Sequence, residues 1–258
     1  TTTGFTGTFA IGTQNLIALG VLTHAGGTIT ISTGQFRVSN GTITSALTAT
    51  GAATISFSGF MTIGVGGTFT ANASSITVNG NWNTSAGTFS FGTSTVTFES
   101  NATITGVSDG VQDFYNMTID VGITVTNLTN NTWVLNALDL NGTLLGGSPN
   151  DPQLIFFLSG ESDSSPLNLG VNGDADTSGY FIYRWRGACG GTMTITATTY
   201  QHLGVQGGNS GCAATVSLAG NISTPSCGVY NECAIIFNSE ATGTPAANFV
   251  VNTGGFTI

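Results

Sequence analysis

The chain contains no lysine, and its only arginines are Arg37, Arg184 and Arg186. Charged residues make up 6% of its 258 residues, against roughly 25% in an ordinary soluble domain. Binding of nucleic acid requires several Lys or Arg side chains that together neutralise phosphates. Three arginines in a chain of net charge −9 therefore predict no nucleic-acid partner, and the surface must be covered by uncharged polar residues.

Long apolar runs and helix signals are also missing. The longest apolar runs, such as 234–237, fall far short of the ~20 residues that span a bilayer, so we expect no membrane span. Glu and Lys, the usual formers of surface helices, are nearly absent, and no capping box precedes an apolar stripe of period 3.6. Because the chain starts at Thr1 rather than at Met, we expect a secreted chain whose signal peptide has been removed.

The feature that is present is a repeat of Gly-Thr-apolar in the first half of the chain. Its copies begin at Gly7, Gly27, Gly67 and Gly87, a step of 20 residues with one double interval, and an off-lattice copy begins at Gly41. Repetition at this period indicates a solenoid, in which each coil buries its apolar residues only against its neighbours. Short alternating runs such as 28–31 and 95–98 supply the strands, and glycines supply the turns.

The period selects among all-β architectures. A sandwich spaces its strands at roughly 8 to 12 residues, whereas one coil of two or three strands takes about 20. We therefore predict a parallel β-helix with like residues stacked along its axis. All prolines and cysteines lie beyond residue 145, and 146–152 is a turn-rich stretch. The predicted domains are a solenoid over 1–145 and a β-rich region over 146–258, which is either a separate domain or a cap of the same solenoid.

The middle of the chain resembles a known group of proteins. The run 80–98, followed by 114–119, resembles repeats in large secreted β-helix surface proteins of bacteria and archaea, and the likeness covers roughly residues 60 to 145. This resemblance implies a right-handed parallel β-helix at a cell surface, usually without assigned chemistry. The Thr-rich, charge-poor composition is also similar, more loosely, to archaeal surface-filament and surface-layer subunits.

Cysteines and glycosylation sequons both point to an extracellular setting. The four cysteines, Cys189, Cys212, Cys227 and Cys233, form an even, clustered set that suits two disulfides, with three pairings open; their spacing fits zinc poorly. Nine Asn-X-Ser/Thr sequons are candidate glycan acceptors, although a chain rich in Thr and Asn also produces sequons by chance. The predicted acceptors are Asn40, Asn72, Asn83, Asn101, Asn116, Asn127, Asn130, Asn141 and Asn221.

One local motif resembles the opening of a calcium loop. Asp174, Asp176 and Ser178 place oxygen atoms on alternate residues, and Gly179 occupies the sixth position. The twelfth position is Trp185 rather than a bidentate Glu, so an ordinary acidic turn is the simpler interpretation. Calcium is the one cofactor that the sequence offers.

Catalytic arrangements are poorly represented. A polysaccharide-cleaving site would need converging carboxylates, and Asp109, Asp113 and Glu99 are the candidates, with a polar loop between coils as the alternative. His24 and His202 are more simply structural, and no GxSxG motif occurs. We predict no catalytic residue and no enzyme.

Aromatic and arginine residues leave two further interpretations open. Scattered tryptophans can stack on sugars but more often pack in the core of a β protein. The arginines that flank Trp185 share one face of a strand and suggest a salt bridge to Asp174 or Glu232. The aromatic residues in question are Trp82, Trp133, Trp185 and Tyr183.

These observations favour an extracellular structural protein that binds copies of itself in a cell-surface filament or layer. Low charge removes the repulsion that keeps β-sheet edges apart. Residues 1–22, apolar and punctuated by glycine, are the candidate intersubunit strand, and 248–252 is the rival. The alternatives are an adhesin that binds cell-surface glycans through an exposed row of Trp, Tyr and Asn, and a polysaccharide lyase or hydrolase.

Overall fold

The structure, a computed structural model, describes residues 1–2, 4–106 and 114–128 and, after residue 130, Gly142 and the strands given below. Contacts divide the chain into two units, Thr1–Tyr115 and Asn116–Ile258. β14 (Phe114–Ile119) runs through the point of division. The predicted boundary at residue 145 remains a prediction, because the second unit contains paired strands on both sides of it.

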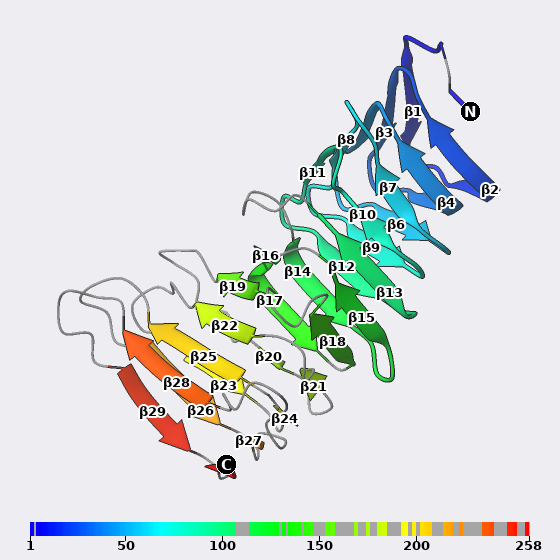
Figure 1. The fold of residues 1–258 in the computed structure, drawn as a ribbon. Coiled ribbons are helices and arrows are strands. Elements are labelled where there is room, and N and C mark those ends of the chain that lie inside the picture. Colours follow the sequence, from blue (N-terminus) through cyan, green and yellow to red (C-terminus); the bar gives the residue numbers. More distant parts are fainter. Residues whose placement is uncertain are drawn as a thin grey trace. The chain divides into compact units, whose positions relative to one another are not determined.

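The first unit is a stack of coils with three strand-bearing faces (Figure 1). One sheet, called sheet A here, holds one strand per coil in the order β1-β3-β5-β8-β11. Its members are β1 (Thr8–Gly12), β3 (Thr28–Ile31), β5 (Ala46–Ala49), β8 (Thr68–Thr70) and β11 (Thr88–Ser90).

A second, larger sheet supplies the other two faces. Its long strands β2 (Leu16–His24) and β4 (Gln35–Ile43) each cover both faces, and β4 pairs with β6 through residues 35–38 and with β7 through residues 41–43. In later coils the long strand is replaced by two short ones. These are β6 (Thr54–Phe57), β9 (Ser75–Val78) and β12 (Thr95–Phe98) on one face and β7 (Met61–Ile63), β10 (Trp82–Asn83) and β13 (Ala102–Thr105) on the other.

Strand register explains the repeat in the sequence. Thr8 pairs with Thr28, and Thr68 pairs with Thr88, so each lattice Gly-Thr opens a strand of sheet A. In the double interval the same position is taken by Ala46, which pairs with Thr28 and Thr68. The off-lattice copy at Gly41 belongs to β4 on another face. The predicted coil of about 20 residues is thereby confirmed.

The second unit is also built from parallel strands. Its steps are longer and less even: Phe181 pairs with Leu203, and Leu203 pairs with Ile235. Its sheets run β15-β18-β21-β24-β27-β30, β16-β19-β22-β25-β28 and β20-β23-β26-β29. The bounds are β15 (Thr124–Asn127), β16 (Asn131–Thr132), β17 (Val134–Leu140), β18 (Thr143–Gly146), β19 (Gln153–Phe157), β20 (Asn168–Leu169), β21 (Asp174–Ala175), β22 (Tyr180–Arg184), β23 (Thr192–Ile195), β24 (Thr198–Thr199), β25 (His202–Gly207), β26 (Ala214–Leu218), β27 (Ile222–Ser223), β28 (Ala234–Ser239), β29 (Ala247–Val251) and β30 (Phe256–Thr257).

Every recorded strand pair is parallel, and the described residues contain no helix. The fold is therefore an all-β parallel solenoid, as predicted, and not a sandwich. None of the described residues belongs to a helix long and apolar enough to cross a membrane.

Aromatic residues form the centre of the first unit. The ring centroid of Trp82, from β10, lies 4.9 Å from that of Phe89 on sheet A in an edge-to-face arrangement. The Phe89 ring lies 5.3 Å from that of Phe69 on the same sheet, in a tilted arrangement. Trp82 and Phe89 are each 1% exposed. Since fully buried aromatic side chains contribute several kcal/mol each, these rings stabilise the contact between coils.

Candidate functional site

The predicted site residues fall mostly outside the described part of the chain. Asp109, Asp113, Asp176 and Ser178 lie outside it, and so do all four cysteines. Asp174 is the first residue of β21, but its side chain is not described. Glu99 is exposed immediately after β12. Among the residues that the structure describes, no group of three metal-ligating side chains occurs. The calcium and carboxylate predictions therefore remain predictions.

Two residues that could bind a ligand or take part in catalysis, Trp82 and His24, have structural roles. Trp82 is packed in the aromatic core and presents no face to solvent. His24 is fully buried, with its Nδ1 2.8 Å from the Thr2 hydroxyl and its Nε2 2.9 Å from the Ala46 carbonyl oxygen. Because a carbonyl only accepts, Nε2 carries the proton and Nδ1 accepts from Thr2. His24, at the end of β2 in the first coil, thus links Thr2 to the third strand of sheet A.

The described sequons differ in their accessibility. Asn101 and Asn72 are exposed, Asn40, Asn83 and Asn116 are half-buried, and Asn127 is 2% exposed. Asn40 Oδ1 accepts a hydrogen bond from the Phe60 amide at 2.9 Å, which connects two coils. The remaining predicted acceptors, Asn130, Asn141 and Asn221, lie outside the described residues.

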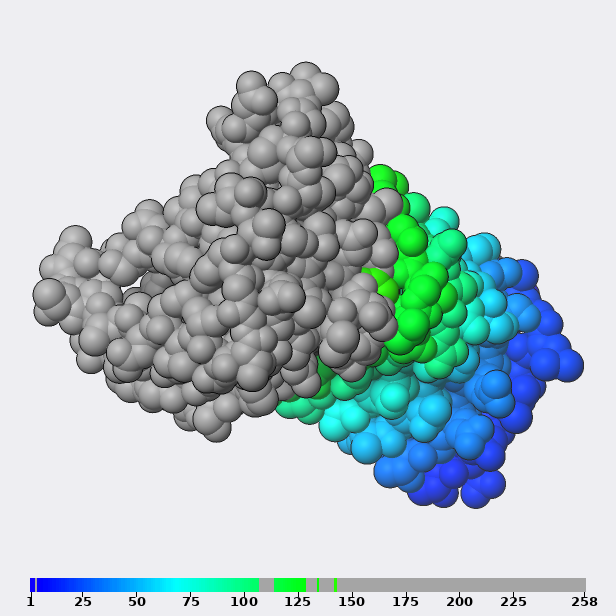
Figure 2. Space-filling model, turned by 90° about the horizontal axis from the view of Figure 1, so that it is seen from below, coloured from blue at the N-terminus to red at the C-terminus, as the bar shows by residue number. Residues whose placement is uncertain are grey.

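The most distinctive surface lies on the first coil. β1 pairs only with β3, and β2 pairs only with β4, so both strands have an open edge among the described residues. Large apolar side chains are exposed here: Phe9 is 48% exposed, and Leu19 is 91% exposed. Figure 2 shows this end of the unit as the blue surface. Open strand edges with exposed apolar side chains are the features that allow another strand to pair. The apolar members are Phe5, Phe9, Ile17, Leu19 and Val21.

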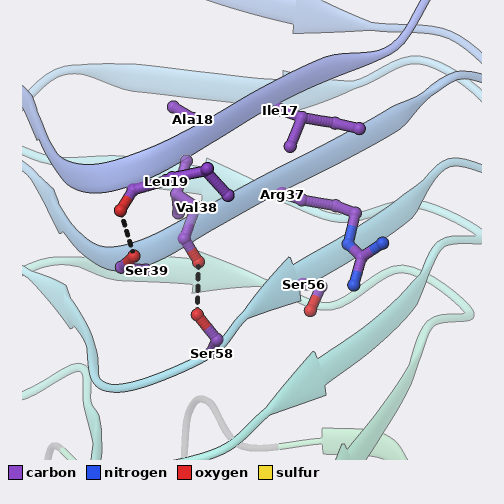
Figure 3. Close-up of a pocket in the computed structure, with 8 residues that line it drawn as sticks. All are labelled: Ile17, Ala18, Leu19, Arg37, Val38, Ser39, Ser56 and Ser58. Carbon is purple, nitrogen blue, oxygen red and sulfur yellow. Dashed lines mark hydrogen bonds between the residues drawn. The ribbon is translucent and has the colours of Figure 1, made fainter.

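A shallow groove of about 180 Å³ adjoins this edge (Figure 3). Its apolar wall comes from Ile17, Ala18 and Leu19 of β2. Ser39 donates a hydrogen bond to the Leu19 carbonyl at 2.9 Å and so holds the bulge of β2 against β4. The rest of the lining, Arg37, Val38, Ser56 and Ser58, comes from β4 and from β6 with the residue that follows it.

Arg37 projects outward from β4 between Ile17 of the preceding coil and Ser56 of the following one. Its side chain is exposed, and within the described residues the structure records no ion pair with a carboxylate. The sequence identifies Arg37 only as one of three arginines and predicts no role for it. The alternation in Gln35-Phe36-Arg37-Val38 was the signal that places it on the outer face. The groove thus offers one cation, hydroxyl groups and an apolar wall, which suit a carboxylate on a neighbouring polypeptide.

In comparisons with known proteins, no family model, curated protein or solved structure matches this chain.

Proposed function

We propose that this chain is a non-catalytic, extracellular structural protein that self-assembles into a cell-surface filament or layer. The observation that carries the proposal is that the apolar side chains of Phe9, Leu19 and Val21 are exposed on strands that, among the described residues, pair along one edge only. Parallel strands give each coil a direction, so the two strand edges of a coil are complementary to each other in strand polarity. Copies related head to tail form a heterologous contact. Such a contact produces an open filament, unless the rotation between successive copies closes the assembly into a ring.

The second unit supplies edges of the matching polarity. Among the residues that the structure describes, β28, β29 and β30 are each the last strand of a sheet of parallel strands. β29 contains most of the segment 248–252 that the sequence offers as a rival donor. We therefore propose contact between β1 or β2 of one copy and one of these last strands of the next. Low charge supports it, since only 6% of the residues would contribute repulsion or desolvation cost.

The resemblance to secreted β-helix surface proteins of bacteria and archaea is part of this proposal, as are glycosylation and two disulfides. A flat solenoid coated with Ser, Thr and Asn presents uncharged hydrogen-bonding groups to its neighbours. The described residues offer no exposed tryptophan for stacking on sugars, because Trp82 is buried. We therefore favour self-association over glycan binding.

Electron microscopy of purified protein tests the proposal with a matched pair of variants. Val21→Lys places a charge at the open edge, where charged side chains oppose strand addition. Val65→Lys places the same charge on another exposed valine, 82% exposed and between β7 and β8. We expect Val21→Lys alone to shorten or abolish the polymers. Polymers of equal length and number from both variants would show that the first coil does not take part in the contact between copies.

A further inference from the structure

Two exposed residues of opposite charge lie on the same face of the first unit. Arg37 projects from β4, and Glu99 follows β12 on the outward side of the alternation that buries Val96 and Phe98. Neither has an ion-pair partner recorded among the described residues. With 3 arginines against 12 acids in the whole chain, an exposed arginine at a groove is a scarce group.

Strand register fixes how far apart the two charges lie. Arg37 pairs with Ser56, Ser56 with Thr77, and Thr77 with Thr97, so Arg37 is three strand steps from Thr97, which precedes Glu99 by two residues. At about 4.8 Å per step this is roughly 14 Å along the sheet. The two side chains are therefore too far apart to form an ion pair within one copy.

The face between them is suited to close approach. The column that joins them, Ser56, Thr77 and Thr97, consists of small hydroxyl residues without charge. The groove beside Arg37 has an apolar wall of Ile17 and Leu19, which reduces the access of water to the guanidinium group. The stretch from β4 to β12 carries a cation on its β4 side and an anion on its β12 side, so it is complementary to itself when turned by a two-fold axis.

We propose that a second copy of this chain docks on the face β2-β4-β6-β9-β12 in antiparallel orientation, with Arg37 of each copy bound to Glu99 of the partner subunit. In such an isologous contact both ion pairs form together. The inference rests on the proposed self-assembly and adds a lateral contact to the axial one. Axial contacts alone produce a filament, and a lateral two-fold joins filaments into pairs or sheets.

The size of the face indicates a contact that is weak by itself. Five strands of about five residues cover roughly 400 Å² per copy, which is half of the about 800 Å² per partner in a stable complex. Exposed ion pairs add little each and are screened by salt. Within a polymer the same contact repeats along the axis, so avidity makes it effective.

The absence of lysine gives this proposal a specific test. Arg37→Lys creates the only lysine of the full chain and keeps the charge. A zero-length carbodiimide couples a lysine amine to a carboxylate that touches it, so we expect a covalent dimer in low salt whose cross-linked peptide joins residues 37 and 99. The separation of roughly 14 Å excludes the same link within one copy.

Two controls define the outcomes. Adding Glu99→Gln to Arg37→Lys should reduce the dimer at least tenfold, and Thr68→Lys, which places the only lysine on sheet A, should yield no link to residue 99. Absence of the 37–99 link in low salt, or a dimer linked through other carboxylates, overturns the lateral contact. Polymers that form without this link leave the proposed function standing, whereas the link in a protein that never polymerises supports the contact and contradicts the filament.

Discussion

Phe9 and Ile29 are in register on adjacent strands of sheet A, yet Phe9 is 48% exposed and Ile29 is 2% exposed. The same inward column continues through Leu47 and Phe69 to Phe89, and all of these are buried. Phe9 thus continues the core column on a strand that no other coil covers among the described residues. A substitution at Phe9 therefore tests assembly, whereas a substitution at a buried residue of the same column tests the stability of the fold.

We expect Phe9→Ala and Phe89→Ala to have different effects. Phe89→Ala removes a buried ring that contacts Trp82 and should lower the free energy of unfolding by about 3–5 kcal/mol. Phe9→Ala should cost about 1 kcal/mol, since half of that ring is already in water, but should reduce polymer length. Urea denaturation and electron microscopy measure the two effects. Equal losses of stability would contradict the stacking order.

His24 provides a second test through its two hydrogen bonds. His24→Leu leaves the Ala46 carbonyl and the Thr2 hydroxyl without this partner, so we expect a loss of about 1–3 kcal/mol in urea denaturation. Thr2→Val removes only the bond to Nδ1 and the one from the Ala25 amide, so it should cost less and mainly release the N-terminal residues to protease. A Thr2→Val variant as unstable as His24→Leu would show that the bond from the Ala25 amide contributes as much as the bond to Ala46 and would contradict this expectation.

Two glycines with similar backbone angles differ in the space around them. Gly27 has φ +69°, and an added Cβ would overlap the Gly7 carbonyl oxygen and the Phe5 ring. Gly66 has φ +77° and open space. Gly66→Ala should cost about 1 kcal/mol for the left-handed conformation alone, and Gly27→Ala clearly more. Thermal unfolding of both variants measures the difference, and equal midpoints would argue against this packing at the first corner.

Ser74 and Ser94 occupy equivalent positions in successive coils and test the value of a buried hydroxyl. The Ser94 hydroxyl is fully buried and has no hydrogen-bond partner among the described residues, whereas the Ser74 hydroxyl donates to the Gly51 carbonyl at 3.4 Å. We expect Ser94→Ala to be neutral or stabilising and Ser74→Ala to cost about 0.5–1 kcal/mol. A destabilising Ser94→Ala in urea denaturation would indicate a partner for this hydroxyl.

The fold was predictable because its signal is local and repeated. Each Gly-Thr-apolar copy on the 20-residue lattice opens a strand of sheet A, and the gap in the series corresponds to Ala46, which keeps the register without the motif. The division of the larger sheet into two faces was not predictable. β4 is one continuous strand, whereas the next coil has two separate strands, β6 and β7, that pair with it. The position of this interruption depends on the geometry of the turn between the two strands.

The candidate site was less predictable than the fold. The sequence singled out residues 1–22, and the structure places most of them in the chain's own first coil, where Leu19 and Val21 are exposed at an open edge. The relation between Arg37 and Glu99 could not be anticipated. It depends on strand registers that differ by one or two residues from coil to coil, and a shift of one residue would turn either side chain to the other face.

Cryo-electron microscopy of the purified full chain tests the central claim most directly. Head-to-tail addition of parallel coils predicts filaments or sheets of filaments in which strands are spaced about 4.8 Å apart along the filament axis, across the junction between copies as well as within each copy. Protein that remains monomeric at every concentration, or polymers whose strands run along the filament axis, would contradict it.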